Sequence, residues 1–257
     1  MASKTIMSQN GSAPLGFIDI HCHILPGLDD GPLKIEESLK MIEVAIEDGI
    51  SYIFATPHII DGMYANRGSG IILALENLKM RMQGALTLFY GADVRVTFDL
   101  IERIEREEVP SLNGSGYMLI EFPEYIIPPH VDNLFFNLRH RDITPIITHP
   151  ERHLRLMQDL SALSILRDSG AMCQITAMSV TGGFGKSVRK ASFAMIEKGL
   201  VDFVASDAHN PKGRPPILSK AYETIKKEFG GDLSEQLFFS NPKMIVEAAL
   251  QGMPRKA

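Results

Sequence analysis

The sequence alternates short apolar runs with helix-length segments, and this alternation is the strongest indication of the fold. Seven runs rich in β-branched and aromatic residues recur: FIDIHC (17–22), SYIFAT (51–56), LTLFYG (86–91), YMLIEF (117–122), ITPIITH (143–149), MCQIT (172–176) and VDFVAS (201–206). Helical periodicity between them predicts helices over 35–49, 71–83, 98–108, 130–140, 159–169 and 186–199. This alternation predicts an α/β fold with a parallel sheet covered by helices. Seven units without a glycine-rich dinucleotide turn favour a closed or nearly closed barrel.

Composition is that of an ordinary globular protein, with 45% hydrophobic and 22% charged residues. The net charge of −5 argues against nucleic-acid binding, and no apolar run approaches the ~20 residues that cross a membrane. We expect one domain over residues 17–257, after a disordered lead-in over 1–16 that lacks the apolar middle of a signal peptide. With only two cysteines, the chain is expected to work in the reducing cytoplasm.

Six of the seven runs carry an ionisable side chain at or just beyond their carboxyl end. In chain order these are His21 and His23, His58, Asp93, Glu121, His149, and Asp207 with His209. Because chemistry in barrels gathers where strands end and loops begin, we expect these groups to form one site. Clustered carboxylates repel one another unless cations hold them. A mixture of imidazole and carboxylate suits Zn, Fe, Mn or Ni better than Ca.

The H-x-H pair in the first run predicts a shared metal. Side chains alternate across a strand, so His21 and His23 lie on one face and can bind one ion. Asp19 is expected on that face too, where it could orient a ligand histidine. Cys22 is expected to point toward the helices as a packing residue.

Taken singly, these residues also have structural interpretations. His58 or His149 alone could be a hydrogen-bonded core histidine, and Glu121 could cap a helix or pair with Arg152. All of them together are hard to explain in that way, because buried charges without partners are costly. Three other histidines stay outside the predicted site: His130 and His140 are expected on a helix surface, and His153 is left unassigned.

Five motifs in this order, DIHCHILPGLDDGP, ATPH, LIEFP, THPER and SDAHNPKGRPP, resemble the PHP (polymerase and histidinol phosphatase) superfamily. The resemblance runs from about Phe17 to Pro216 and is closest to bacterial protein-tyrosine phosphatases of capsule and exopolysaccharide synthesis. It implies a distorted (β/α)7 barrel with an active site at the carboxyl ends of the strands. It also implies up to three metal ions, usually Mn²⁺, with Fe, Zn or Mg as alternatives. The implied ligands are His21, His23, Asp30, His58, Asp93, Glu121, His149, Asp207 and His209, with Glu121 bridging.

Two arginines match the phosphate-contacting arginines of that family: Arg152 in THPER and Arg214 in GRPP. The alternative role for Arg152 is an ion pair with Glu151 or Glu124. At one position the chain departs from the family, because Asp93 stands where a glutamate is usual, and the third metal position therefore stays open. The segment IIDGMYANRGSG (59–70) resembles the loop beside the family's site, so Tyr64 could meet a substrate or pack as part of a lid.

The expected activity is metal-dependent hydrolysis of phosphotyrosine, in which hydroxide formed at the metals attacks phosphorus while the arginines neutralise charge. A phosphocysteine route is excluded, because Leu28 and Ser179 stand six residues after the two cysteines where an arginine is needed. The expected substrate is a bacterial tyrosine kinase of polysaccharide export. Two alternatives remain: a small-molecule phosphoesterase such as a histidinol-phosphate phosphatase, and a weakly catalytic, metal-stabilised regulatory protein. The presence of Asp93 in place of the usual glutamate is the only feature that favours the regulatory protein.

Overall fold

The computed structural model describes residues 16–251. The lead-in expected over 1–16 therefore lies outside the described residues, apart from Gly16. All strand pairings within this range are parallel, in two sheets of order β1-β2-β4 and β3-β5-β6-β7-β8-β9. The strands are β1 (Phe17–Cys22), β2 (Ile50–Ala55), β3 (His58–Ile59), β4 (Thr87–Tyr90), β5 (Asp93–Arg95), β6 (Tyr117–Glu121), β7 (Thr144–Thr148), β8 (Met172–Thr176) and β9 (Phe203–Ala205).

The two sheets are parts of one barrel with seven strand positions. At two of these positions, two short consecutive strands take the place of one continuous strand. Strand β2 continues into β3 across Pro57, whose missing N–H interrupts the ladder, and β4 continues into β5 across Gly91. Gly91 lies against η1 (Leu112–Gly114), where an added Cβ would come within 2.6 Å of Leu112. The ring closes where Cys22 pairs with Ala208 and the His23 N–H donates to the Ala208 carbonyl at 2.8 Å. The predicted seven-unit barrel is confirmed, and the two breaks account for its distortion.

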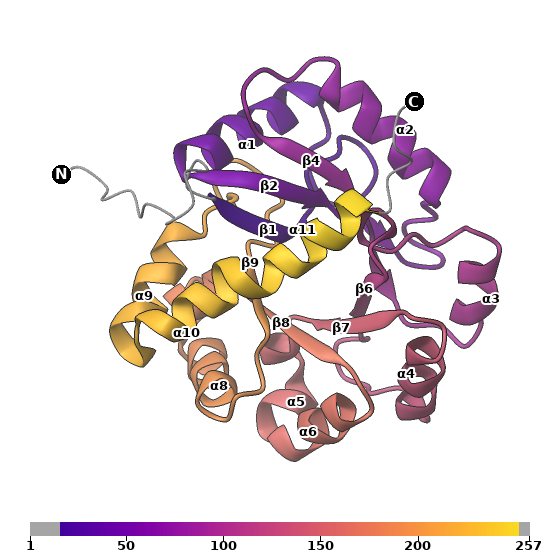
Figure 1. Cartoon of the computed structure of the whole chain (residues 1–257), viewed down its shortest axis with the longest axis vertical. Coiled ribbons are helices and arrows are strands. Elements are labelled where there is room, and N and C mark those ends of the chain that lie inside the picture. Colours follow the sequence, from indigo (N-terminus) through magenta and orange to yellow (C-terminus); the bar gives the residue numbers. More distant parts are fainter. Residues whose placement is uncertain (1–15, 252–257) are drawn as a thin grey trace.

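The helices surround the barrel (Figure 1). They are α1 (Ile35–Glu47), α2 (Gly68–Lys79), α3 (Leu100–Glu105), α4 (Val131–Arg139), α5 (Leu154–Gln158), α6 (Leu160–Asp168), α7 (Ala177–Thr181), α8 (Lys186–Glu197), α9 (Ser219–Phe229), α10 (Gly231–Glu235) and α11 (Asn241–Gln251), with the 3-10 helix η2 (Pro150–Arg152) and the π-helix η3 (Gln236–Ser240). All six predicted helices are present, although α2 lies three to four residues before the expected 71–83. Apolar periodicity marks the buried face of a helix better than its ends.

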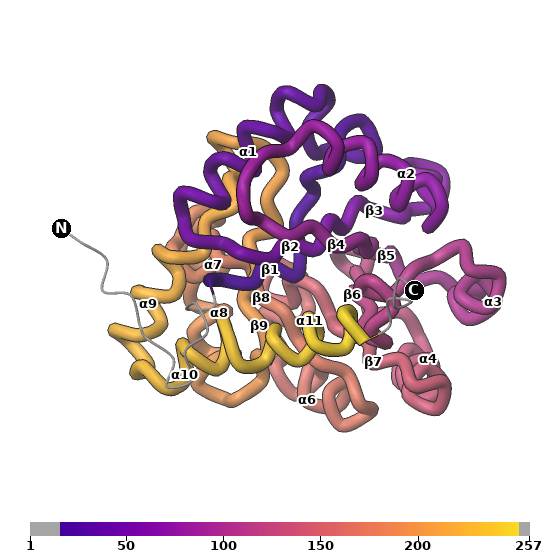
Figure 2. The backbone as a smooth tube through the Cα atoms, turned by 45° about the horizontal axis from the view of Figure 1, so that its top comes forward, coloured from indigo at the N-terminus to yellow at the C-terminus, as the bar shows by residue number. Residues whose placement is uncertain are grey.

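The barrel interior holds its own apolar cluster, which includes Ile18, Phe54, Phe89 and Phe203. Helix α11 runs across the barrel on the side away from the carboxyl ends of the strands and adds Ile245 to this cluster (Figure 2). A second, larger cluster lies between the strands and the outer helices. With one end of the barrel closed by α11, the opposite end is left to the polar strand termini. Among the described helices, none combines the length and apolar character that a bilayer span requires.

Candidate metal and phosphate site

The nine residues expected to bind metal gather at the carboxyl end of the barrel. His21 and His23 lie at the end of β1, Asp30 in the loop before α1, His58 and Asp93 at the starts of β3 and β5, Glu121 at the end of β6, His149 after β7, and Asp207 and His209 after β9. Eight of them form three overlapping groups whose ligand atoms lie within 4.8 Å of one another: His21–His23–Asp207, His23–Asp30–His58–His209 and His58–Asp93–Glu121. His149 adjoins the third group, with its Nε2 3.7 Å from Glu121 Oε1.

The first group converges on one point between two imidazole rings. The Nε2 atoms of His21 and His23 lie 3.0 Å apart. Both Nδ1 atoms are engaged elsewhere: His23 donates to Asp29 at 2.6 Å, and His21 donates to the Gln174 side-chain oxygen at 2.8 Å. Each ring, when neutral, therefore presents a lone pair on Nε2. Asp207 Oδ1 lies 3.5 Å from one Nε2 and 3.4 Å from the other. Two lone pairs and a carboxylate oxygen repel one another unless a cation or a proton lies between them.

The protonation of the two rings indicates what holds them together in the metal-free chain. Burial would lower the pKa of His23, but Asp29 and Asp207 raise it to about 10. Burial lowers the pKa of His21 to about 4. One proton on His23 thus occupies the position between the rings, and a divalent cation would replace it. These residues fit a metal.

Asp93 is the central carboxylate of the third group. The side chain is fully buried, and its Oδ2 lies 3.2 Å from His58 Nδ1, 3.6 Å from His21 Nε2 and 3.8 Å from His149 Nε2. Neither Asp93 Oδ2 nor His58 Nδ1 has a hydrogen-bond partner within residues 16–251. Burial alone would raise the pKa of Asp93, but the surrounding imidazoles hold it well below its ordinary value. A buried, charged oxygen amid ring nitrogens is the donor set of a cation site, so the shorter aspartate still reaches the cluster.

The second group is the one that faces solvent. His209 donates from Nδ1 to the Asp207 carbonyl at 2.9 Å, which leaves its Nε2 lone pair directed at Asp30 Oδ1, 3.4 Å away. The same oxygen lies 3.6 Å from His58 Nε2. The Asp30 side chain is 47% exposed, whereas the other members of the group are buried. A cation held here would therefore be open to an incoming ligand.

Both predicted arginines lie beside the cluster, and both bind Asp207. Arg152 Nη1 lies 2.9 Å and Arg214 Nη2 lies 2.7 Å from Asp207 Oδ2. The alternative pairing of Arg152 with Glu151 is wrong: Glu151 is buried and accepts hydrogen bonds from the Thr176 N–H and the Ser179 hydroxyl. No ion pair joins Arg152 to Glu124 in the described part of the chain. The arginines thus stand at the edge of the candidate metal site.

Comparison with known proteins decides the family. Residues 17–247 match the family described as capsular polysaccharide synthesis, CpsB/CapC. The chain belongs to the CpsB/CapC family. The resemblance given by the five motifs is therefore confirmed.

Relatives of this CpsB/CapC protein align over most of its length. The tyrosine-protein phosphatase YwqE of Bacillus subtilis (strain 168) is 37% identical over 223 residues, which cover 86% of this chain and 88% of YwqE. The tyrosine-protein phosphatase CpsB of Streptococcus pneumoniae is 33% identical over 237 residues, covering 89% of this chain and 98% of CpsB. A chain from the crystal structures of YwqE and CpsB, described as metal-dependent tyrosine phosphatases, superposes with a TM-score of 0.87 at 36% identity, covering 90% of this chain and 94% of that one. A lactonase from Listeria monocytogenes, at 16% identity and a TM-score of 0.54, shares the fold.

Several residues that orient the candidate ligands were not predicted from the sequence. Asp29 binds His23 and also accepts from the His58 N–H at 2.9 Å, and Gln174 binds His21. The expectation that Asp19 orients a ligand ring is wrong. Its carboxylate binds Ser206, because the register of β1 is irregular between Asp19 and Cys22 and the strict alternation of side chains is lost there. Cys22 does pack toward the helices, as expected.

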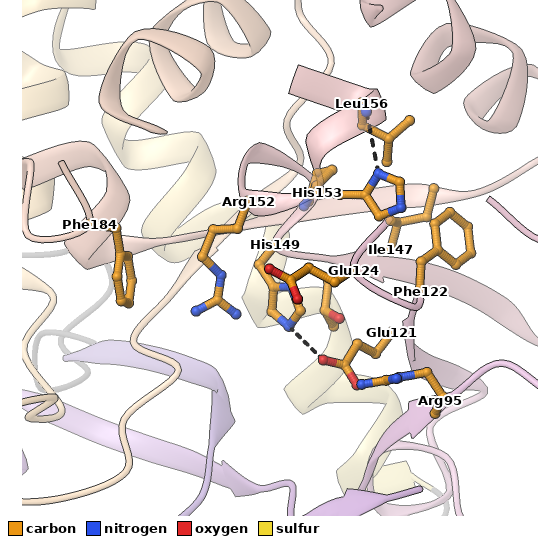
Figure 3. A pocket seen from close by; sticks show the side chains of 12 residues that line it. Arg95, Glu121, Phe122, Glu124, Ile147, His149, Arg152, His153, Leu156 and Phe184 are labelled. Carbon is orange, nitrogen blue, oxygen red and sulfur yellow. Dashed lines mark hydrogen bonds and ion pairs between the residues drawn. The ribbon is translucent and has the colours of Figure 1, made fainter. Parts of the chain in front are cut away.

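Arg95 is the third arginine of the site. Its Nε donates to Glu121 Oε2 at 2.8 Å, so the suggested pairing of Glu121 with Arg152 is wrong. Burial and the neighbouring Asp93 charge raise the pKa of Glu121, and Arg95 opposes this. Arg95 and Glu121 line a cavity of about 330 Å³ next to the cluster, which Arg152 borders from the other side (Figure 3).

The remaining histidines and the loop over 59–70 lie outside the three groups of candidate metal ligands. His130 and His140 flank α4 on the surface, as expected. His153, left unassigned, caps α5 by accepting from the Leu156 N–H at 3.3 Å and lines the cavity. Tyr64 stacks on the His58 ring with centroids 5.8 Å apart, and Asn66 fixes the loop by donating to the Leu28 and His58 carbonyls.

Proposed function

We propose that this chain is a metal-dependent protein-tyrosine phosphatase that hydrolyses phosphotyrosine in a protein substrate. The observation that carries the proposal is the position of Asp207, which joins the candidate metal cluster to both arginines through its two oxygens. A phosphate bound by those arginines would lie directly beside the cluster. Its relatives YwqE and CpsB, which are named tyrosine-protein phosphatases, support the same activity.

Divalent cations bound by the nine ligands would lower the pKa of a coordinated water and polarise the phosphoryl group. The residues of the chain supply the rest. Arg152 and Arg214 can each grip phosphate oxygens with a planar fork, and Asp207 keeps both guanidinium groups in place before the substrate arrives. A phenol leaves with a pKa of ~10, so its departure needs less help from an acid than that of an alkyl alcohol. No cysteine is required.

We propose Mn²⁺ as the ion, with Fe, Zn and Mg as alternatives, since imidazole and carboxylate donors accept all of them. We propose that the protein substrate is a tyrosine kinase that controls capsule or exopolysaccharide synthesis, which the family description supports. Two free, buried cysteines fit a reducing cytoplasm.

Turnover by metal-reconstituted protein tests the proposal. A phosphotyrosine peptide, the phosphoserine peptide of the same sequence and histidinol phosphate would be compared at matched concentrations with each of the four ions. The proposal predicts the highest kcat/KM for the phosphotyrosine peptide. Preferred hydrolysis of histidinol phosphate would instead assign a small-molecule phosphoesterase. Full metal occupancy without turnover of any substrate would assign a regulatory protein.

A further inference from the structure

The cavity beside the candidate metal cluster has two unlike ends. One end is formed by charged and polar side chains, among them Glu121, His149 and Arg152. The other end is apolar: Phe122, Ile147 and Leu156 are buried in the wall there. These three side chains are almost fully buried, so the apolar surface that a ligand could reach lies elsewhere in the cavity.

Phe184 completes the lining and has no role in the hydrophobic core. It is half-buried and belongs to neither of the two apolar clusters of the barrel. Its contacts are with the site: the Arg152 guanidinium lies 5.0 Å and the Arg214 guanidinium 5.7 Å from the ring centroid. Figure 3 shows Phe184 beside Arg152, on the side away from His149 and Glu121.

The loop between α7 and α8 brings Phe184 into this position. Gly182 and Gly185 flank it at φ values of +89° and +94°, which side-chain-bearing residues rarely adopt. An added Cβ at Gly183 would lie 2.6 Å from the terminal methyl group of Met178, which would have to move aside. Glycine on both sides permits the backbone conformation in which Phe184 faces the arginines. A large apolar side chain kept in this way outside the core is available to a ligand.

We propose that this cavity is a subsite for the aromatic ring of an aryl phosphate, and that Phe184 is the wall that selects aryl over alkyl esters. The inference rests on the proposed phosphatase function and specifies which part of the substrate the chain recognises. With its phosphate at Arg152 and Arg214, a phosphorylated tyrosine would place its ring against Phe184. A phosphorylated serine has no ring to fill this space, and its shorter side chain would bring the peptide backbone against the rim.

Phe184 could instead act only through the arginines, since a guanidinium over an aromatic face is attracted to it. The two roles differ in what they do to selectivity. A residue that merely positions Arg152 and Arg214 would affect every phosphate ligand equally. A residue that contacts the ring of the ligand would change the preference for aryl over alkyl ligands.

Binding of two non-hydrolysable probes separates these roles. The dissociation constants of phenylphosphonate and methylphosphonate would be measured by calorimetry on the metal-loaded full chain, for wild type, Phe184→Leu and Phe184→Tyr. The matched control is Phe136→Leu, which changes an exposed phenylalanine on α4, 57% accessible. Thermal unfolding would verify that each variant is folded.

The wild type and Phe136→Leu should bind phenylphosphonate about tenfold more tightly than methylphosphonate, given typical aromatic contact strengths. Phe184→Leu should reduce this ratio toward unity, and Phe184→Tyr should preserve it. Equal binding of both probes by the wild type would overturn the proposal, as would an unchanged ratio in Phe184→Leu, including a parallel weakening of both probes. If Phe184→Leu does not fold, the binding ratios of the wild type and of Phe184→Tyr still test the proposal, because both should favour phenylphosphonate. These measurements need no turnover, so a failure of the proposed phosphatase activity would be seen separately, as an inert wild type in the peptide assay.

Discussion

Arg152 and Asp207 are paired at 2.9 Å at the edge of the candidate metal cluster. The other oxygen of the same carboxylate faces the ring nitrogens of His21 and His23. The position of Arg152 is thereby tied to the position of the cluster, and a phosphate that binds the arginine must lie beside the cations.

Arg152→Ala should lower kcat on a phosphotyrosine peptide by about 10²–10³-fold while the fold and the metal content persist, because the lost guanidinium stabilises charge that develops in the transition state. Arg152→Lys should recover only part of the rate, since an ammonium cannot reproduce the two-pronged grip. Arg155→Ala, an exposed arginine on α5, is the matched control. Steady-state kinetics with metal analysis checks this, and wild-type kcat in Arg152→Ala would remove Arg152 from the catalytic set.

Asp93→Asn should lower the number of bound metal ions as well as the rate. The change keeps the shape of a fully buried side chain, and the Thr148 hydroxyl can still donate to Oδ1 at 3.1 Å, but the charge that faces three imidazoles is lost. Asp93→Glu keeps the negative charge but lengthens the side chain, so it separates the effect of the charge from that of the side-chain shape. Metal stoichiometry by mass spectrometry is the measurement, with the exposed Asp132→Asn as control. An unchanged stoichiometry with near-normal turnover would show that Asp93 is no ligand.

Asp29→Asn should weaken metal binding by about 10–100-fold although Asp29 is not itself one of the predicted ligands. Its two oxygens accept from three donors: the His23 ring, the His58 N–H and the Gly31 N–H. The amide group of an asparagine would set an N–H against one of these donors and release the His23 ring. Competition with a metal-sensitive dye would measure the affinity. Equal affinities for Asp29→Asn and Asp132→Asn would contradict this role.

The metal-free protein should lose stability on both sides of neutral pH. Burial lowers the pKa of His21 to about 4 and that of His149 to about 3, below the ordinary 6.5. As pH falls from about 6.5, the unfolded chain takes up protons that the folded chain cannot, so folding is destabilised. On the alkaline side, the stabilisation from His23 is complete below 6.5 and is lost as pH rises through its folded value of about 10. Urea unfolding of chelated protein over this range checks the prediction, and constant stability from about pH 6.5 to 5 would refute it.

The sequence was sufficient to predict the barrel and the gathering of ionisable side chains at one end of it, because both follow from local patterns. Apolar runs mark the barrel strands, and an ionisable residue at the carboxyl end of a strand lies at that end of the barrel. Signals for the breaks were also present, in Pro57 and Gly91. The sixth run, MCQIT, has no ionisable end, yet its polar Gln174 interrupts an apolar stretch and proves to bind His21.

What the sequence could not provide depends on distant contacts. Asp29 and Asp30 are adjacent, and only the fold decides which of them binds His23 and which faces solvent. The pairing of Glu121 with Arg95 rather than Arg152 depends on the register of β5 against β6. The role of Asp19 was mispredicted because an irregularity in β1 shifts the alternation that the pattern assumed. The position of Phe184 requires a glycine loop to meet two arginines from other segments.

In the proposed reaction, metal ions bound by the histidine–carboxylate cluster are required for hydrolysis and no thiol takes part. The most direct test is turnover of a phosphotyrosine peptide by wild type and Cys22→Ala, each after chelation and again after reconstitution with Mn²⁺. Cys22 is fully buried, and burial raises the pKa of its thiol well above the ordinary value, so it stays protonated. Chelation should abolish turnover in both proteins, and the ion should restore it in both. Undiminished turnover by metal-depleted wild type, or an inactive Cys22→Ala with full metal content, would contradict the proposed reaction.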